Sequence, residues 1–399
     1  MQVDRERVLD LVAQQNLLPK SAWHLCKSTP QMPFSTRLEG QMNQMLSTQI
    51  ALLKRPHMKT LSLNACLEIP IPLQDGLERL TLHMDRTADL PAAFPSSLKS
   101  VHMVKSYRLF PFRFNVGMYM SRLPPDLPEL VLCGNILDDD NDCTLPIGLQ
   151  RLVLQDVDGV PPSMPDALQE LTVIGGCVDL DLPPALKTLI FRGTDQCMDC
   201  TCVAHCQQTL ELQELPSTLE TLEITKYKVV HLPLLPSSLV HLELGHMTYD
   251  GPLDLPDTLL TAVLPRGFSH RIIVPPLLQK LVFSMSGGYN HALSLPDTLK
   301  VLKLPPAYDH PLGVPPGLEV LGMRGNRVFA QRLPPLPTSL KTLILDDGYK
   351  HPFEALPPSL RHLRLGEDYQ HPLPAHNLRQ LHVHISYKHR VDKITNVYL

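Results

Sequence analysis

Aromatic and charged residues are both scarce in this chain of 399 residues. Aromatics make up 5% of it and charged residues 19%, and the single tryptophan is Trp23. The net charge of −4 contrasts with the basic excess of general nucleic-acid binders, so no nucleic-acid partner is expected. No apolar run reaches the length of about 18 residues that a membrane-spanning helix needs, so no membrane partner is expected either.

The N-terminal sequence lacks the long apolar stretch of a secretory signal. The sequence therefore predicts an intracellular, cytoplasmic protein whose nine cysteines stay reduced. Glycine-rich phosphate loops, nucleophile elbows and zinc-protease motifs are also missing. These absences predict a protein that is not an enzyme.

Leucine and proline, by contrast, are abundant, with 74 leucines and 40 prolines. Proline removes a backbone donor and clashes with the preceding helical turn, so this content excludes long helices over most of the chain. A hydrophobic content of 43% is too high for a disordered chain. Together these features indicate a repeat in which proline recurs at harmless positions.

The pattern Leu-x-x-Leu-x-Leu recurs about sixteen times, at spacings of mostly 18 to 22 residues. Its copies start at Met58, Leu77, Leu98, Leu127, Leu149, Leu168, Leu186, Leu219, Leu239, Leu259, Leu278, Leu299, Leu318, Leu340, Leu360 and Leu378. The last two leucines of each copy alternate with other residues, which predicts a short strand with one buried side. One unit cannot bury its leucines alone, whereas stacked units can.

The sequence thus predicts a β-rich solenoid, a leucine-rich-repeat-like stack of parallel-stranded coils, over residues 56–390. The longer spacings predict insertions near residues 104–122 and 194–213. Residues 391–399 are expected to be a C-terminal tail.

The repeats of the C-terminal half resemble the FNIP repeat, a variant of the leucine-rich repeat. The resemblance rests on LPPSLRHLRLGEDYQHPL (Leu356 to Leu373) and on aromatic-x-His-Pro loops such as those at Tyr308, Tyr349 and Tyr369. The asparagine that usually follows the strand of a leucine-rich repeat occurs only at Asn135 and Asn326. Another group must therefore satisfy the backbone of the remaining turns.

Residues 1–55 lack the repeat and show helical spacing of apolar residues. One interpretation is a small helical N-terminal cap over the first coil. The other follows from a faint resemblance of Val8 to Ser28 to an F-box, which implies a degenerate F-box-like segment. That resemblance implies docking to a ubiquitin-ligase subunit.

Two clusters could hold a metal. Cysteines crowd the second insertion, at Cys197, Cys200, Cys202 and Cys206, and could bind zinc as thiolates, form a redox-labile cluster or lie in an inert loop. The acidic run from Asp138 to Asp142 could bind calcium but lacks the glycine turn of an EF-hand loop, which favours a solvated loop.

Outward-facing strand residues form a predicted binding surface that is polar and turns basic toward the C-terminus. Its members are Lys280, Lys303, His362, Arg364, Gln380, His382 and His384. No aromatic cluster marks a hot spot on it.

A second set of residues occupies one position of the repeat loop and predicts a histidine column: His270, His291, His310, His351, His371 and His389. Gln331 takes the same position in one copy. An imidazole can pass hydrogen bonds along such a column or satisfy turn backbone. Metal capture and contact with a partner are the alternatives.

The functional hypothesis is a non-catalytic scaffold or adaptor that binds protein partners through the solenoid face. A more specific version makes the chain a substrate-recognition adaptor of a ubiquitin ligase. The alternative is a metal- or thiol-dependent enzyme centred on Cys197 to Cys206.

Overall fold

The computed structural model describes residues 59–64, 73, 75–84, 94–105, 114–136, 144–157, 163–175, 180–193, 209–247, 249, 251–284, 288–374, 377–389 and 396–398. The chain divides into two compact units, Met1–Ala185 and Leu186–Leu399. The predicted cap or F-box-like segment of residues 1–55 lies outside the described residues, as do Cys197 to Cys206 and Asp138 to Asp142.

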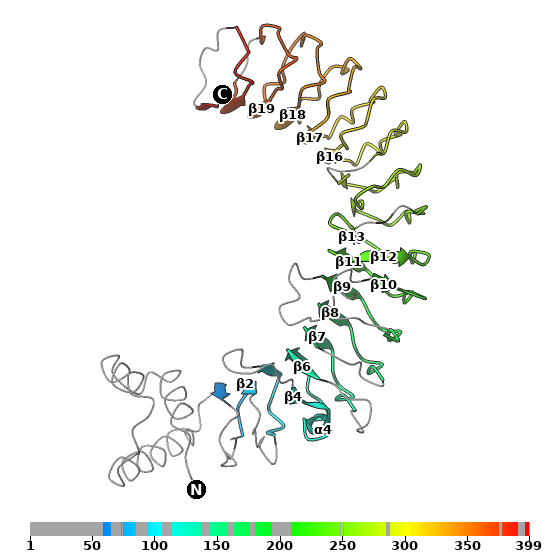
Figure 1. Ribbon diagram of the computed structural model, residues 1–399, viewed down its shortest axis with the longest axis vertical. Helices are drawn as coiled ribbons and strands as arrows, with labels where there is room; N and C mark the ends of the chain where they lie inside the picture. The colour runs from blue at the N-terminus through cyan, green and yellow to red at the C-terminus, as the bar shows by residue number, and fades with distance from the viewer. Residues whose placement is uncertain are drawn as a thin grey trace, which may run out of the picture. The chain divides into compact units, whose positions relative to one another are not determined.

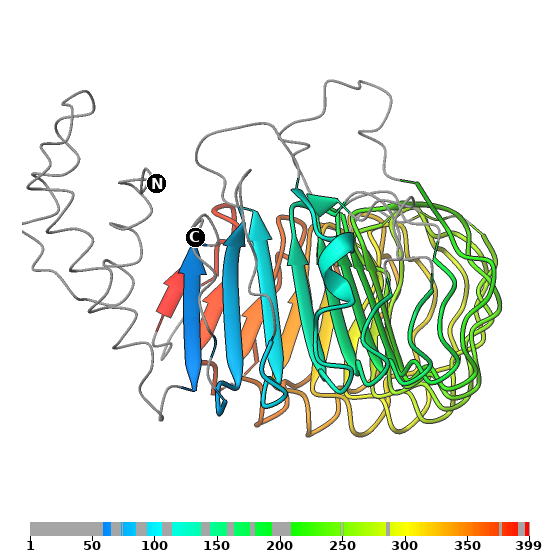
Figure 2. The same ribbon diagram turned by 90° about the horizontal axis from the view of Figure 1, so that it is seen from below.

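The first unit contains a ladder of parallel strands in chain order, seen side by side in Figure 2. Its members are β1 (Thr60–Asn64), β2 (Arg79–Met84), β3 (Ser100–Lys105), β5 (Glu129–Cys133), β7 (Arg151–Gln155) and β8 (Glu170–Ile174). A two-stranded pair, β4 (Phe114–Asn115) and β6 (Asn135–Ile136), accompanies it.

The helix α4 (Gly117–Met120) lies in the predicted insertion at residues 104–122 and is the only helix among the described residues. Among all residues that the structure describes, no helix is long and apolar enough to cross a membrane.

The second unit contains a longer ladder, again parallel and in chain order (Figure 1). Its members are β9 (Thr188–Arg192), β11 (Thr221–Thr225), β13 (His241–Glu243), β14 (Thr261–Val263), β15 (Lys280–Val282), β16 (Val301–Lys303), β17 (Val320–Met323), β18 (Thr342–Leu345), β19 (His362–Arg364), β20 (Gln380–His382) and β21 (Asn396–Tyr398). A separate pair joins β10 (Thr209–Glu211) to β12 (Lys228–His231). The strand β21 lies within the predicted tail of residues 391–399 and extends the ladder by pairing with β20.

The ladders follow the predicted repeat closely, since a strand begins two residues after each of its predicted starts. The parallel-stranded solenoid expected from the leucine pattern is therefore confirmed. The pairing aligns leucine with leucine: Leu343 faces Leu321 on one neighbouring strand and Leu363 on the other. These leucines are at most 1% exposed, so each coil completes the core of the next.

Hydroxyl groups bond to the preceding coil at the turn before seven of the strands, and these bonds are here called the hydroxyl ladder. Ser339 donates from its Oγ to the carbonyl oxygen of Leu318 at 2.7 Å, and Ser359 donates to that of Leu340 at 2.6 Å. The same bond recurs at Ser97, Thr218, Ser238, Thr258 and Thr298. In these seven coils, a short side chain immediately before the core leucine thus ties the coil to the preceding one.

One coil uses asparagine instead. Asn326 is 1% exposed. Its amide nitrogen donates to the carbonyl oxygens of Pro305 and Tyr308, at 3.2 and 2.8 Å. Its amide oxygen accepts from the backbone amides of Val328 and Phe329, at 2.9 and 2.8 Å. One side chain therefore satisfies four backbone groups in two adjacent coils.

Candidate functional site

The strands of the second unit present an ordered outward surface, here called the strand face. Burial alternates along β11, where Leu222 and Ile224 are buried and the other three residues are half-buried. In Figure 1 these strands lie along the inner side of the curve formed by the second unit. Since neighbouring strands are in register, outward residues align into two columns.

One column runs through Lys280, Val301, Val320, Thr342, His362 and Gln380. The other runs through Val282, Lys303, Gly322, Ile344, Arg364 and His382. Six of the seven residues predicted to form a binding surface lie in these columns, and the seventh, His384, follows β20.

The structure gathers some of these residues and separates others. Arg364, His382 and His384 line one pocket. His362 contacts Gln380 through a hydrogen bond of 2.9 Å between Nδ1 and Oε1. The two lysines lie farther along the ladder, on β15 and β16.

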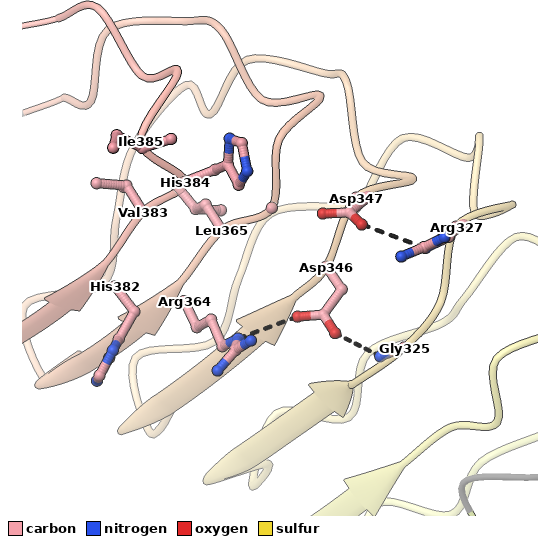
Figure 3. Close-up of a pocket in the computed structure, with 11 residues that line it drawn as sticks. Gly325, Arg327, Asp346, Asp347, Arg364, Leu365, His382, Val383, His384 and Ile385 are labelled. Carbon is pink, nitrogen blue, oxygen red and sulfur yellow. Dashed lines mark hydrogen bonds and ion pairs between the residues drawn. The ribbon is translucent and has the colours of Figure 1, made fainter. Parts of the chain in front are cut away.

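The pocket has a volume of about 600 Å³ and lies where β17 to β20 end (Figure 3). Its walls combine two arginines, two aspartates, two histidines, two glycines and three aliphatic residues. They are Gly325, Arg327, Asp346, Asp347, Arg364, Leu365, Gly366, His382, Val383, His384 and Ile385. Ile385 is 78% exposed, which is unusual for a large aliphatic side chain.

Each arginine of the pocket is held by an aspartate through Nε. Arg364 Nε lies 3.1 Å from Asp346 Oδ1, and Arg327 Nε lies 3.3 Å from an oxygen of Asp347. Asp346 also accepts a hydrogen bond from the backbone amide of Gly325. These contacts orient the guanidinium groups at the rim of the strand face (Figure 3).

The coils pack tightly where these aspartates sit. A Cβ atom on Gly366 would collide with the backbone of Asp346 and Asp347. Glycine at this position lets the loop after β19 approach the loop after β18, which brings Arg364 beside Asp346.

An apolar strip crosses the strand face and was not expected from the sequence, which indicated a polar, mixed face. It consists of Val282, Val301, Val320 and Ile344, which are half-buried and lie on four consecutive strands. The sequence analysis overlooked the strip because it considered mainly the charged outward residues. Reading the outward positions of β15 to β18 in order would have revealed it.

Acidic residues occupy the other end of the strand face, on β11 and β13. Glu223 receives two hydrogen bonds from Arg192, at 2.8 and 3.0 Å. Glu243 is partly buried, and this burial raises the pKa of its carboxyl group against the opposing effect of the Gly245 amide. Along the ladder the face is therefore acidic on β11 and β13, apolar with two lysines on β15 to β18, and basic at Arg364 on β19.

Five of the six histidines of the predicted column bond to backbone of the preceding coil. His351 donates from Nε2 to the carbonyl oxygen of Ala330 at 2.7 Å, and His371 donates to that of Lys350 at 2.8 Å. The same bond recurs at His291, His310 and His389. Each imidazole thus ties its loop to the preceding coil, and these bonds do not run from one imidazole to the next.

Gln331 behaves differently from the histidines. Its amide donates to Asp309 Oδ1 at 3.1 Å, and that carboxylate also accepts from the amide of Ala330 at 2.9 Å. The glutamine therefore reaches a side chain of the preceding coil, where the histidines reach its backbone.

A column of buried aromatic rings stands behind the histidines. The ring of Tyr349 stacks on Phe329 and Tyr369, with centroids 6.3 and 6.4 Å apart. Tyr349 also meets His351 edge-on at 5.8 Å. The sequence motif contained these aromatics, but the stack itself was missed because its signal is their common position in successive loops.

Burial of this column affects the tyrosine hydroxyls. It raises the pKa of Tyr308 and Tyr369 to about 12. The hydroxyl oxygens of Tyr289, Tyr308 and Tyr369 are enclosed and have no hydrogen-bond partner within normal geometry. These phenols therefore act as large packing groups.

Metal binding at the cysteine cluster stays a prediction, because Cys197, Cys200, Cys202 and Cys206 lie outside the described residues. Within the described ranges, no group of three or more potential ligands could hold a metal ion. Cys133, which the structure does describe, is a free thiol whose pKa is raised by burial.

Strand ladder, hydroxyl ladder and strand face together define a leucine-rich-repeat-like β-solenoid. Residues 329–373 match the FNIP Repeat, in agreement with the resemblance seen in the C-terminal half. A comparison with curated protein sequences gave no match. The F-box-like segment finds no support in these comparisons.

Among the solved structures that match this chain are three that share little of its sequence. CroV588, described as a novel circular leucine-rich-repeat protein, is 16% identical with a TM-score of 0.44; the match covers 85% of this chain and 62% of that protein. YopM from Yersinia enterocolitica WA-314 is 20% identical with a TM-score of 0.42, over 99% of this chain and 100% of that one. YopM from Yersinia pestis, a leucine-rich effector protein, is 17% identical with the same TM-score, over 99% of each chain.

Proposed function

We propose that this chain is a protein-interaction scaffold that binds its partner on the strand face of the second unit. The observation that supports this most directly is the apolar strip. Aliphatic side chains on an outward sheet face expose apolar surface to water, which is unfavourable. A partner that covers them removes this surface from solvent and so gains binding free energy. The ladder holds these side chains in fixed register, so little conformational freedom is lost on binding.

The surroundings of the strip agree with this function. Protein interfaces combine an apolar centre with a polar rim, and arginine is enriched among their energetically important residues. The strip has Glu243 beyond one end and Arg364 with the pocket beyond the other. Binding of a protein partner is sufficient to account for an apolar strip with charged residues beyond both ends.

The test is affinity purification of the full chain and of a variant carrying Val320→Glu and Ile344→Glu, followed by mass spectrometry. Both positions face outward, so folding should survive, which circular dichroism would check. The matched control is Ile273→Glu, at a side chain that is 86% exposed and outside the strands.

Partners that bind the strand face should be lost from the double variant and kept by the control. An identical set of captured proteins for all three chains would refute the proposal.

The ubiquitin-ligase version of this function is a finer proposal that rests on the F-box resemblance of residues 1–55. It requires those residues to bind a ligase subunit while the solenoid holds a substrate. The comparison is between the full chain and one that starts at Arg55. Recovery of ligase subunits by both chains, or by neither, would remove this version.

A further inference from the structure

We propose that the strand face from β15 to β20 recognises an acidic segment with interspersed apolar residues, running across the strands toward the pocket. This inference rests on the proposed scaffold function and specifies the chemistry of the partner. Three observations carry it: the charge of this part of the face, the spacing of its cations, and the pocket at its end.

The charge of this region has one sign. Its outward strand positions contain Lys280, Lys303 and Arg364 and no acidic residue. Asp346, just after β18, is already engaged by Arg364 and the Gly325 amide. The chain as a whole has a net charge of −4, so the basic character is local.

The two lysines are available for a partner. Neither Lys280 nor Lys303 forms an ion pair with another described residue, in contrast to Arg151, Lys187 and Lys341 in or next to other strands. The charge of Lys280 acts from a distance on Glu243, where it opposes the rise in the pKa of that carboxyl group. Cations outside ion pairs attract an approaching acidic ligand and speed its association.

The register sets the spacing that the partner must match. Lys303 and Arg364 share a column and lie three strands apart, or about 14 Å at the usual strand separation. Gly322 and Ile344 lie between them in that column. A matching segment places two carboxylates about 14 Å apart, with apolar side chains between them to cover the strip.

That spacing suits two conformations. It corresponds to nine or ten residues of α-helix, at about 1.5 Å per residue. It also corresponds to about four residues of extended chain. Both conformations fit a segment that crosses the strands.

The ends of the face favour one charge distribution in the partner. Glu243 repels acidic side chains of the partner at the β13 end. At the other end Arg364 and His382 belong to both the face and the pocket, beside the exposed Ile385 (Figure 3). The acidic groups of the segment should therefore concentrate over β15 to β20, with an apolar residue against Ile385.

The test uses a phage-displayed library of random peptides of about 20 residues, the length of a helix of about 30 Å. Selection is performed on the full wild-type chain, on Lys280→Glu/Lys303→Glu, and on the charge-matched control Arg266→Glu/Arg271→Glu. The control residues are exposed and lie outside the strands. Circular dichroism establishes that all three chains are folded.

The wild type and the control should enrich peptides that combine aspartate or glutamate with aliphatic residues. The lysine variant should lose them, and a synthetic copy of an enriched peptide should bind it about tenfold more weakly, a change of about 1.4 kcal/mol. Binding to the wild type should also weaken as salt is added.

Several results would overturn the inference: no enrichment, enrichment without acidic residues, or equal binding to the wild type and the lysine variant. Lysine-dependent binding of a nucleic-acid oligonucleotide in place of peptides would also overturn it. The scaffold function would still stand if proteins captured from extract depended on Val320 and Ile344 but not on the two lysines.

Discussion

Asn326 shows how much one side chain contributes to a turn between coils. In the Asn326→Ala variant, two backbone amides and two carbonyl oxygens lose their partners inside the fold. Each buried polar group left unsatisfied costs about 1–3 kcal/mol, so we expect the free energy of unfolding to fall by about 3 kcal/mol or more. Urea unfolding followed by circular dichroism measures this loss.

The matched control is Asn290→Ala. Asn290 is exposed, and its side chain accepts one bond, from the amide of Asp309 at 2.9 Å. Its replacement should cost about 1 kcal/mol or less, because water can satisfy the amide that is released. Similar losses at the two positions would contradict the role given to Asn326.

The buried tyrosines predict a loss of stability at alkaline pH. The folded-state pKa of Tyr308 and Tyr369 is raised to about 12, above the unfolded value of about 10. Between these values the unfolded chain has released protons that the folded chain retains. The stabilising contribution is therefore complete below about pH 10 and is lost as the pH rises toward 12.

Replacing both tyrosines by phenylalanine should reduce this alkaline loss. It also removes two enclosed hydroxyls that have no hydrogen-bond partner within normal geometry, so stability near pH 8 should be unchanged or higher. Urea unfolding of both proteins at about pH 8 and about pH 11 measures how much unfolding free energy each loses. Equal losses in the two proteins would show that groups other than these tyrosines control stability at alkaline pH.

At the scale of a single strand, β18 tests the assignment of inner and outer faces. Leu343 is fully buried between neighbouring coils, whereas its neighbour Thr342 lies on the strand face. Leu343→Asp should cost several kcal/mol because it buries a carboxylate without a partner. Thr342→Asp should change the free energy of unfolding by less than about 0.5 kcal/mol.

Chemical denaturation of both variants provides the comparison. Nearly equal costs at the two positions would mean that the face assignment of this strand is incorrect.

At the scale of the whole molecule, the division into two compact units predicts separate responses to damage. Solenoid stability is approximately a sum of coil and interface contributions. Leu343→Asp should therefore accelerate amide hydrogen exchange in coils of the second unit around β18. Exchange in the first unit, at β5 to β8, should stay as in the wild type.

Leu171→Asp on β8 is the reciprocal variant, because Leu171 is also fully buried. It should accelerate exchange in the first unit and leave β17 to β19 unchanged. Global acceleration by either substitution would show that the chain unfolds as one cooperative body.

The leucine pattern was sufficient to locate the strands, because a strand needs only two inward side chains at alternate positions and each repeat supplies them. The common loop position of the histidines left bonds along the column, bonds to backbone, metal capture and partner contact open, and only the structure shows their bonds to the preceding coil. The hydroxyl ladder was not assigned, since a serine or threonine before a leucine carries no distinctive signal. Only a neighbouring coil identifies the carbonyl that accepts its bond.

For the strand face, the sequence by itself determined which residues point outward, because alternation along a strand is local. It thereby named Lys280, Lys303, His362, Arg364, Gln380 and His382. Aligning the repeats also places these residues and the valines in columns, because every strand begins at the same repeat position. Tertiary structure alone decided that Arg364 meets Asp346 at a pocket. That contact depends on how loops of coils about twenty residues apart pack together, and local sequence carries little information about contacts over that distance.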